Sequence, residues 1–368
     1  MNKRICTILS VFLTLSSLAS ANAAPFAKTD TLYAAKLKPY GRYLFNKQRK
    51  LELISSAVHF GFSFNGTKCA IYTELPDTNG HSYLQYELDG VYQKRVRIGG
   101  SANQPLVINA SAGNHTVWVY KTTEATTGAV IISKVAADKV APLSVTNAPL
   151  IEFIGNSITC GAAADASDVV CGGGDYIDQH NAYMAYGPRV ARALNTNYIL
   201  TSVSGIGVYR TWNMDGLSMP QVYENTDLQL NSSNKWNFSQ YSPKIVSIAL
   251  GTNDMSKGDG VHARAPFDTT TFTNKYVKFV QLVKSKYPKA QIALLSSPMI
   301  KGKERIVLQN CLTAIKAKVD ALYPTDKKVA TFFFEPMEPH GCSAHPSVED
   351  HAILADQLKP FFAGLLKE

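Results

Sequence analysis

The spacing of apolar residues changes near residue 145, and this change most constrains what the chain can fold into. Before it, short segments of alternating apolar residues, such as 59–64, are separated by turn signals such as Asn65-Gly66. Many short strands about ten residues apart predict a β-sandwich or jelly roll. We expect its further strands at residues 69–72, 83–88, 92–98, 106–108, 115–120 and 129–135.

After residue 145, fully apolar runs alternate with longer amphipathic segments. We expect strands at 150–154, 198–203, 245–250, 292–296 and 329–334, and helices at 182–194, 273–287, 304–322 and 347–366. Apolar strands of this kind suit a parallel sheet buried on both faces, and their alternation with helices predicts an α/β fold. We therefore predict a β domain over residues 24–145 and an α/β domain over residues 146–368, as the chain length also suits two domains.

The first residues have the layout of a secretory signal peptide. Lys3 and Arg4 precede an apolar run over residues 5–18, and Ala21-Asn22-Ala23 supplies small residues before a cleavage point. We predict a signal peptide over residues 1–23 and a secreted or periplasmic mature protein. A retained membrane anchor is the less favoured alternative, because the apolar run is short for a bilayer span.

The net charge of +9 gives little indication of a partner. Its Lys and Arg residues are scattered, without a block of five or six, so we expect no nucleic-acid partner. We also expect no attachment to a membrane once the signal is removed, and a monomer.

Five cysteines remain after the predicted cleavage, and an oxidising compartment favours their pairing. We expect the pairs Cys160–Cys171 and Cys311–Cys342, with Cys69 as a buried free thiol, although sequence alone does not fix connectivity. Neither a C-x-x-C nor an H-E-x-x-H motif occurs, so we expect no zinc site.

Three of the predicted parallel strands end in residues suited to catalysis. Ser157 follows the first strand, Gly205 the second, and Asn253 the third. Ligands of open α/β sheets bind at the carboxyl ends of the strands. A glycine allows close approach of the backbone, and an asparagine amide offers two donors. Each residue alone is a common cap or loop ending, so the indication comes from their recurrence.

His345 lies in a loop just before the last predicted helix, within Gly341-Cys342-Ser343-Ala344-His345-Pro346. A histidine in a structured loop is a candidate general base, because its pKa lies near neutral pH. We expect His340 and His351 to be exposed and not to share this role.

In order and context, Gly155-Asn156-Ser157, Gly205, Gly251-x-Asn253 and His345 resemble the four conserved blocks of the SGNH (GDSL-like) hydrolases. Segments 113–117, 121–124 and Gly341-Cys342-x-x-His345-Pro346 are similar to the second carbohydrate esterase family, the acetyl xylan esterases. This resemblance implies an N-terminal jelly-roll β-sandwich. It also implies a three-layer α/β/α, flavodoxin-like hydrolase domain with a five-stranded parallel sheet.

The resemblance also implies a role for each residue. Ser157 would be the nucleophile, His345 its base, and the N–H groups of Ser157 and Gly205 with the Asn253 amide the oxyanion hole. It implies a serine esterase that removes acetyl groups from acetylated plant polysaccharide, xylan or glucomannan, through an acetyl-enzyme. No cofactor or metal is implied.

Two positions depart from the family pattern. Asn156 replaces the usual Asp, at little cost, because that side chain does not react. Ser343 occupies the position of the acid two residues before the histidine. Either a Ser343 hydroxyl or main-chain oxygen orients His345 in a Ser–His dyad, which we favour, or a remote carboxylate does so. The candidate carboxylates are Asp254, Glu335 and Glu338.

The Gly-rich segment 161–181 is expected to form the rim of the pocket. We expect aromatic side chains to stack on sugar rings, with Asp254 also near substrate, whereas Trp118 is expected in a core. The stacking candidates are Tyr176, Tyr209, Trp212 and Trp236, with ordinary packing as the alternative for each.

Two other functions compete with the plant-polysaccharide esterase. The first is a periplasmic esterase for acetylated bacterial cell-wall polymer. The second is a glycan-binding protein with a decayed hydrolase site, suggested by Ser343 at the acid position.

Overall fold

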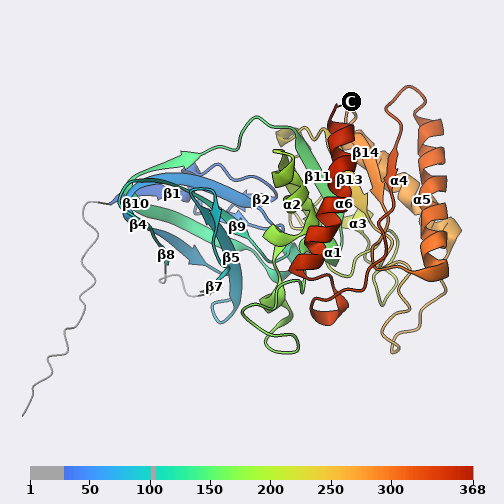
Figure 1. The fold of residues 1–368 in the computed structure, drawn as a ribbon, viewed down its shortest axis with the longest axis horizontal. Coiled ribbons are helices and arrows are strands. Elements are labelled where there is room, and N and C mark those ends of the chain that lie inside the picture. The colour runs from blue at the N-terminus through green and yellow to red at the C-terminus, as the bar shows by residue number, and fades with distance from the viewer. Residues whose placement is uncertain (1–28, 101–104, 368) are drawn as a thin grey trace, which may run out of the picture.

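Within the residues that the structure describes, two hydrogen-bonded sheets organise the chain, an antiparallel one of ten strands followed by a parallel one of five (Figure 1). The computed structural model describes residues 29–100 and 105–367. The predicted signal peptide, residues 1–23, lies outside the described residues. The first sheet ends with β10 (Val130–Leu143) and the second begins with β11 (Leu150–Gly155).

The N-terminal sheet is built around two long strands, β10 and β4 (His59–Glu74), which pair with each other. Phe60, Phe62 and Phe64 alternate along β4 and are buried in the core of this domain. The other strands are β1 (Asp30–Tyr33), β2 (Tyr43–Phe45), β3 (Leu51–Leu53), β5 (His81–Leu88), β6 (Val91–Tyr92), β7 (Val96–Gly99), β8 (Leu106–Asn109) and β9 (Asn114–Lys121).

The turn predicted at Asn65-Gly66 is wrong, because β4 continues through it. Gly66 has a φ of +110° and the pairing with β10 is irregular here, so the strand bends without reversing. Residues 59–65 pair with β9 and residues 68–71 with β8, so cross-strand pairing overrides the local turn signal.

The C-terminal sheet is entirely parallel, in the order β12-β11-β13-β14-β15. This is the flavodoxin-like order, and the predicted five-stranded α/β domain is confirmed. Its further strands are β12 (Asn197–Ser202), β13 (Ile245–Ala249), β14 (Gln291–Leu295) and β15 (Ala330–Phe332). The helices are α1 (Ser157–Cys160), α2 (Tyr186–Ala193), α3 (Met219–Val222), α4 (Thr269–Lys286), α5 (Gly302–Leu322) and α6 (Val348–Lys367), and the 3-10 turns are Ala34–Lys36, Ala125–Thr127, Tyr176–Gln179, Ala182–Met184, Phe238–Gln240 and Cys342–Ala344.

Helices cover both faces of the parallel sheet (Figure 1). Ile151 and Phe153 pack in the cluster that contains α2 and α6, whereas Ile154 packs in the cluster of α4 and α5. His351, expected to be exposed, is instead fully buried in α6 beside Tyr186, because it lies on the inward face of that helix.

The two domains share a buried polar contact at Arg42, which is fully buried. Its Nη1 donates to the Asn225 carbonyl at 2.7 Å, and its guanidinium lies 4.9 Å from the ring centre of Trp236. Trp236 is buried and stacks on Tyr241. Of its two predicted roles, ordinary packing therefore holds and sugar stacking does not. Trp118 is half-buried and packs against the α/β-domain cluster, so it does not lie in the β-domain core.

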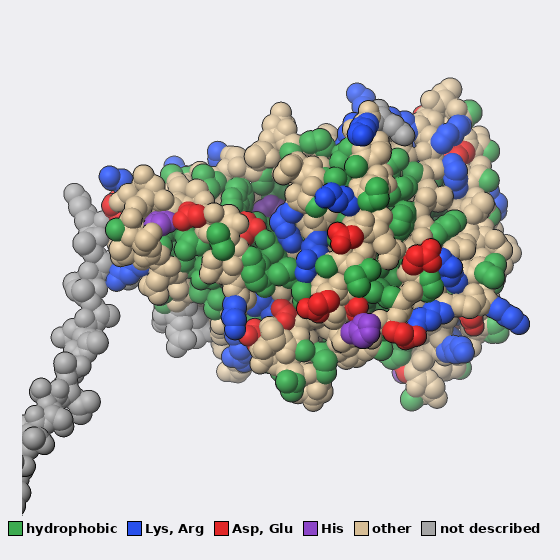
Figure 2. Space-filling view, in the orientation of Figure 1, with side chains coloured by type: hydrophobic (Ala, Val, Ile, Leu, Met, Phe, Trp, Pro, Cys, Tyr) green, Lys and Arg blue, Asp and Glu red, His purple; other side chains and the backbone are tan. Residues whose placement is uncertain are grey.

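On the face shown in Figure 2, Lys and Arg side chains are dispersed among acidic side chains and form no single charged patch. Over the residues that the structure describes, no helix combines the length and apolarity needed to cross a bilayer.

Candidate active site

The turn after β11 presents Ser157 at the carboxyl edge of the parallel sheet. Asn156 caps the turn, since its Oδ1 accepts from the Ile158 N–H at 3.1 Å. Gly155 is required by packing, because a Cβ there would lie 2.0 Å from Thr159 Oγ1. Gly161 ends α1 with a φ of +65°, the left-handed region that favours glycine. The local sequence therefore folds into one sharp turn with Ser157 at its apex.

Ser157 and His345, 188 residues apart, lie in hydrogen-bond contact. His345 Nε2 is 2.9 Å from Ser157 Oγ, and His345 Nδ1 is 2.8 Å from the main-chain oxygen of Ser343. A carbonyl can only accept, so Nδ1 carries the proton and Nε2 accepts from the Ser157 hydroxyl. This tautomer is the one that a general base requires.

A backbone twist aims the Ser343 carbonyl at His345. Ser343 has φ and ψ of 50° and 39°, in the left-handed region that few residues other than glycine adopt. The next residue, Ala344, also has a positive φ of 55°. This twist turns the main-chain oxygen of Ser343 toward the His345 ring.

The three carboxylates considered as remote acids are engaged elsewhere. Glu335 pairs with Arg305, and Glu338 with Lys301, and both side chains are more than three-quarters exposed. Asp254 is fully buried, and its carboxylate accepts from the N–H groups of Val208 and Tyr209 at 2.9 and 3.0 Å.

Burial sets the protonation of His345. Desolvation lowers the pKa of the imidazole below its usual 6.5, and the bond to the Ser343 carbonyl opposes this shift only in part. At neutral pH the ring is therefore uncharged and able to accept a proton.

The loops after β12 and β13 meet Ser157 across a cavity of about 600 Å³. Gly205 has a φ of +75°, and Asn253 is held by a bond from Nδ2 to the Ile206 carbonyl at 2.8 Å. An amide has two N–H donors, so the second stays free for a ligand. The cavity is lined by Ser157, Tyr176, Ser204, Gly205, Trp212, Thr252, Asn253, Ser256, Met299, Ser343, Ala344 and His345.

Two half-exposed aromatic side chains flank the reacting residues. Trp212 is 42% exposed, and its backbone N–H donates to the Gly205 carbonyl at 2.8 Å. Tyr176 is 41% exposed and presents its ring to His345, with centroids 6.3 Å apart. Both offer an apolar face to the cavity.

Tyr209 and Asp254, both predicted to contact substrate, are not among the residues that line this cavity. Tyr209 packs on Phe267, and Asp254 points inward to hold the segment that leads to Trp212. Asp254 directly follows the cavity residue Asn253, and Tyr209 lies three residues before Trp212, but neither side chain lines the cavity.

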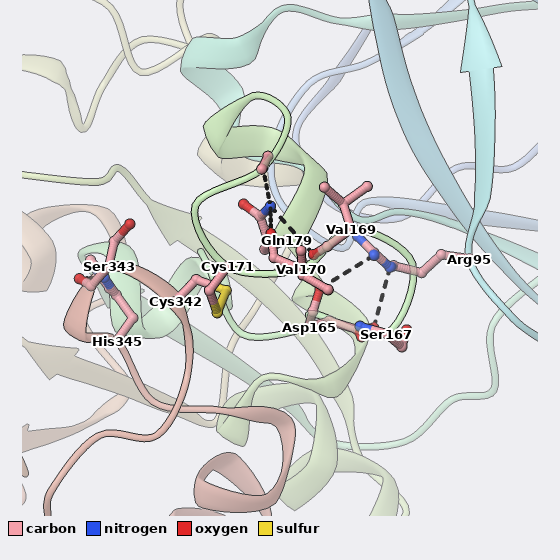
Figure 3. The surroundings of a disulfide bond; sticks show 11 residues. Arg95, Asp165, Ser167, Val169, Val170, Cys171, Gln179, Cys342, Ser343 and His345 are labelled. Atoms are coloured by element: carbon pink, nitrogen blue, oxygen red, sulfur yellow. Dashed lines mark hydrogen bonds and ion pairs between the residues drawn. A yellow bond between two sulfur atoms is a disulfide. The ribbon is translucent and has the colours of Figure 1, made fainter.

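A disulfide joins Cys171, in the rim segment, to Cys342, three residues before His345 (Figure 3). Both predicted pairs are therefore wrong. Cys160 is fully buried beneath the pocket with its thiol 3.2 Å from Ser202 Oγ, and Cys311 packs on the inner face of α5. Cys69 is a buried free thiol, as predicted.

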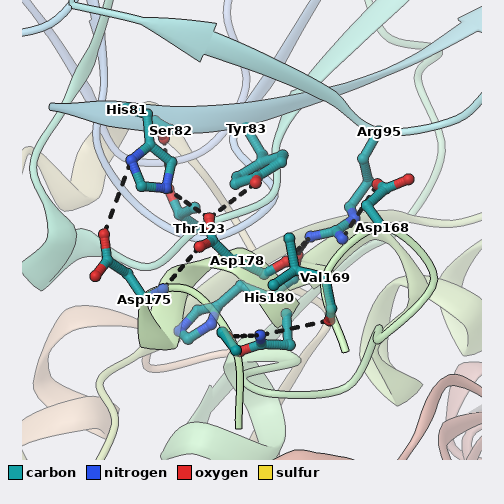
Figure 4. Close-up of polar contacts among 12 residues, drawn as sticks. His81, Ser82, Tyr83, Arg95, Thr123, Asp168, Val169, Asp175, Asp178 and His180 are labelled. Carbon is teal, nitrogen blue, oxygen red and sulfur yellow. Dashed lines mark hydrogen bonds and ion pairs between the residues drawn. The ribbon is translucent and has the colours of Figure 1, made fainter. Parts of the chain in front are cut away.

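The rim segment is also anchored to the N-terminal domain (Figure 4). Arg95 donates to the carbonyls of Asp178 and His180 at 2.9 and 2.8 Å. His81 and Tyr83 both reach Asp178 Oδ1, at 2.5 and 2.8 Å. The N-terminal domain thus fixes the segment that carries Tyr176.

His81, Asp175 and Asp178 have the spacing of a three-ligand metal site, with ligand atoms within 4.8 Å of one another. The Asp178 carboxylate, however, already accepts from Tyr83, His81 and the Asp175 N–H. Three of the roughly four acceptor positions of this carboxylate are used in holding the rim, so we assign His81 and Asp178 to anchoring.

Comparisons with known proteins define the class of this protein. Residues 40–145 match the carbohydrate esterase 2 N-terminal domain, and residues 153–332 match the GDSL-like lipase/acylhydrolase family. The chain is a carboxylic ester hydrolase with a GDSL-like catalytic domain. It combines the two domains of the family 2 carbohydrate esterases, which confirms the resemblance seen in the sequence.

Individual relatives share both domains. An acetylxylan esterase/glucomannan deacetylase of Cellvibrio japonicus is 25% identical over 292 residues, covering 78% of this chain and 77% of the relative. The structure of a family two carbohydrate esterase from the same organism has a TM-score of 0.79 at 24% identity, covering 92% of this chain and 98% of that one. A family two esterase from Clostridium thermocellum, in complex with cellohexaose, has a TM-score of 0.76 at 26% identity, covering 92% and 99%.

Proposed function

We propose that this protein is an exported esterase that removes acetyl groups from acetylated plant polysaccharide, xylan or glucomannan. The observation that carries the proposal is the 2.9 Å contact between Ser157 Oγ and His345 Nε2, with the second ring nitrogen tied to a carbonyl. The Cellvibrio relative named for acetylxylan and glucomannan supports the choice of substrate.

In the proposed reaction, Ser157 Oγ attacks the acetyl carbonyl carbon while its proton passes to His345 Nε2. The Ser157 and Gly205 N–H groups and the Asn253 amide bind the oxyanion. The bond to the sugar oxygen then breaks, and His345 returns its proton to that oxygen. Water, deprotonated by His345, attacks the acetyl-enzyme, so acetate leaves and Ser157 regains its proton.

Two further features support a carbohydrate substrate. Trp212 and Tyr176 flank the cavity with partly exposed rings, which suit the apolar C–H faces of sugars. The related Clostridium structure holds cellohexaose, a chain of β-linked sugars. We propose that Trp212 and Tyr176 are the substrate-binding residues.

The proposal is tested by acetate release from three acetylated polymers: xylan, glucomannan and bacterial peptidoglycan. We expect release from a plant polymer, abolished in Ser157→Ala. Preferential release from peptidoglycan would instead assign the protein to the bacterial cell wall. Glycan binding without any acetate release would support a decayed hydrolase.

A further inference from the structure

One buried carboxylate below the active-site cavity comes from the N-terminal domain. Glu124 follows β9 and is 2% exposed. Its Oε2 accepts from the backbone N–H of Ser204 at 2.7 Å, across the domain boundary. Ser204 immediately precedes Gly205, whose N–H is one of the proposed oxyanion donors.

Hydrogen bonds from nearby side chains hold the backbone around Glu124 in place. The buried Lys121 donates from Nζ to the carbonyl oxygens of Thr123 and Glu124, at 3.0 and 2.7 Å. The Thr127 hydroxyl also donates to the Glu124 carbonyl at 2.7 Å. The Glu124 backbone is therefore held rigidly, and its carboxylate accepts from the Ser204 N–H.

Several groups around the carboxylate favour its charged form. Although burial raises the pKa of Glu124, bonds from His180 and from the Ser204 N–H outweigh that effect and lower it. His180 Nε2 lies 3.5 Å from Oε1, and the Cys160 thiol lies 3.5 Å from Oε2. A charged acceptor holds an N–H more strongly than a neutral one.

Gly205 needs such support, because a glycine at a φ of +75° has no side chain to limit rotation of its neighbouring peptides. The peptide that carries its N–H lies between two restraints. Glu124 holds the preceding N–H, of Ser204, and the Trp212 N–H holds the carbonyl of Gly205 at 2.8 Å. Loss of either restraint frees the Gly205 N–H to turn from the cavity.

Building on the esterase function proposed above, we propose that Glu124 is a positioning residue of the oxyanion hole. It fixes the Ser204 N–H so that the Gly205 N–H faces the ester carbonyl. The N-terminal domain thereby contributes to the chemical step, as well as forming a wall of the cleft. Preorganised donors of this kind stabilise the transition state because they need no rearrangement.

The test compares Glu124→Ala, Glu124→Gln and Glu124→Asp with Glu87→Ala as the control. Glu87 also comes from the N-terminal domain and accepts from the Tyr120 and Tyr183 hydroxyls, without touching the segment that carries Gly205. The substrate is 4-nitrophenyl acetate, because an oxyanion hole acts on any ester carbonyl. The measurement therefore does not depend on the natural polymer.

We expect Glu124→Ala to lower kcat by about 10²-fold or more with KM changed only a few-fold, since loss of one oxyanion donor costs about 10²–10³. Glu124→Gln retains an acceptor at the same distance and should keep most of kcat. Glu124→Asp withdraws the acceptor by one methylene and should lose more than Gln. The Glu87→Ala control should keep the wild-type kcat.

If Glu124→Ala does not fold, the comparison of kcat between Glu124→Gln and Glu124→Asp decides the question, and the inference predicts the higher kcat for Glu124→Gln. The inference is overturned if a folded Glu124→Ala keeps the wild-type kcat, or if Asp is active and Gln is not. Wild-type activity on the aryl ester without any on polysaccharide would instead reject the proposed substrate and leave this comparison intact.

Discussion

His345 Nδ1 donates to the main-chain oxygen of Ser343, 2.8 Å away, at the position where a triad would carry its acid. A carbonyl orients the ring but supplies no full charge to stabilise the imidazolium. The contact uses the backbone and not the Ser343 hydroxyl. The main-chain oxygen of Ser343 therefore orients His345, whereas the Ser343 side chain takes no part in this contact.

We predict that Ser343→Ala keeps kcat/KM within about threefold of the wild type, because the carbonyl remains in place. Ser343→Gly should do the same, since glycine adopts a φ of 50° readily. Steady-state kinetics on an acetate ester check this. Glu335→Gln and Glu338→Gln serve as controls for a remote acid and should also stay near wild type. For any of these variants, a fall in kcat/KM approaching the ~10⁴-fold seen on removal of a triad acid would contradict the Ser–His dyad.

The pH dependence of kcat/KM should follow the lowered pKa of His345. The neutral ring is the active base, so activity is lost as pH falls through this pKa. Because burial places the pKa below 6.5, the acid limb should have its midpoint below pH 6.5. A pH–rate profile for the free enzyme tests this, and a midpoint at or above 6.5 would show that the ring is not desolvated as described.

The Cys171–Cys342 disulfide should stabilise both the fold and the His345 loop. The His345 N–H bonds to the Cys342 carbonyl at 3.0 Å, so release of Cys342 loosens the base. We predict that reduction lowers the free energy of unfolding by about 2–4 kcal/mol and also lowers kcat. Denaturant unfolding and kinetics with and without a reductant measure these effects.

The matched control for the disulfide is the double variant Cys171→Ala/Cys342→Ala, on which a reductant should have no effect. Non-reducing peptide mapping should recover Cys171 joined to Cys342. A bridge that contains Cys160 or Cys311 would refute the assignment.

Gly205→Ala should damage catalysis more than stability. Its Cβ would lie 2.8 Å from Trp212 Cδ1 and would occupy a left-handed conformation. We expect kcat to fall about 10²–10³-fold, as for loss of an oxyanion donor. Gly216→Ala is the control, since Gly216 also has a positive φ, of +130°, but its Cβ would meet open space. Equal kcat values for the two variants would argue against a catalytic role for Gly205.

Sequence patterns predicted the elements of the α/β domain well, because burial on both faces leaves a strong local signature in each strand. Parallel topology then explains why Ser157, Gly205 and Asn253 lie together, since each follows a strand at the same sheet edge. Features that depend on long-range pairing were harder to predict. The Asn65-Gly66 turn signal is overridden by cross-strand pairing, and the disulfide depends on how a rim segment meets a distant loop.

Most of the features of the candidate site that the sequence did not predict also depend on contacts between residues far apart in the chain. Tyr209 and Asp254 lie near pocket residues in sequence, but side-chain direction is set by packing that the local sequence does not reveal. The orienting group on His345 is a main-chain oxygen, which has no residue signature. Glu124 stands in a segment noted for its family resemblance, but its contact with Ser204 crosses between domains.

The central claim is that Ser157, activated by His345, takes up the acetyl group. Its most direct test is to quench the enzyme during turnover of an acetylated xylo-oligosaccharide and to map the acetylated peptide by mass spectrometry. The account predicts acetyl on Ser157 in the wild type and neither acetylated peptide nor acetate from Ser157→Ala. Acetate released by Ser157→Ala at the wild-type rate, or acetyl on another residue, would contradict it.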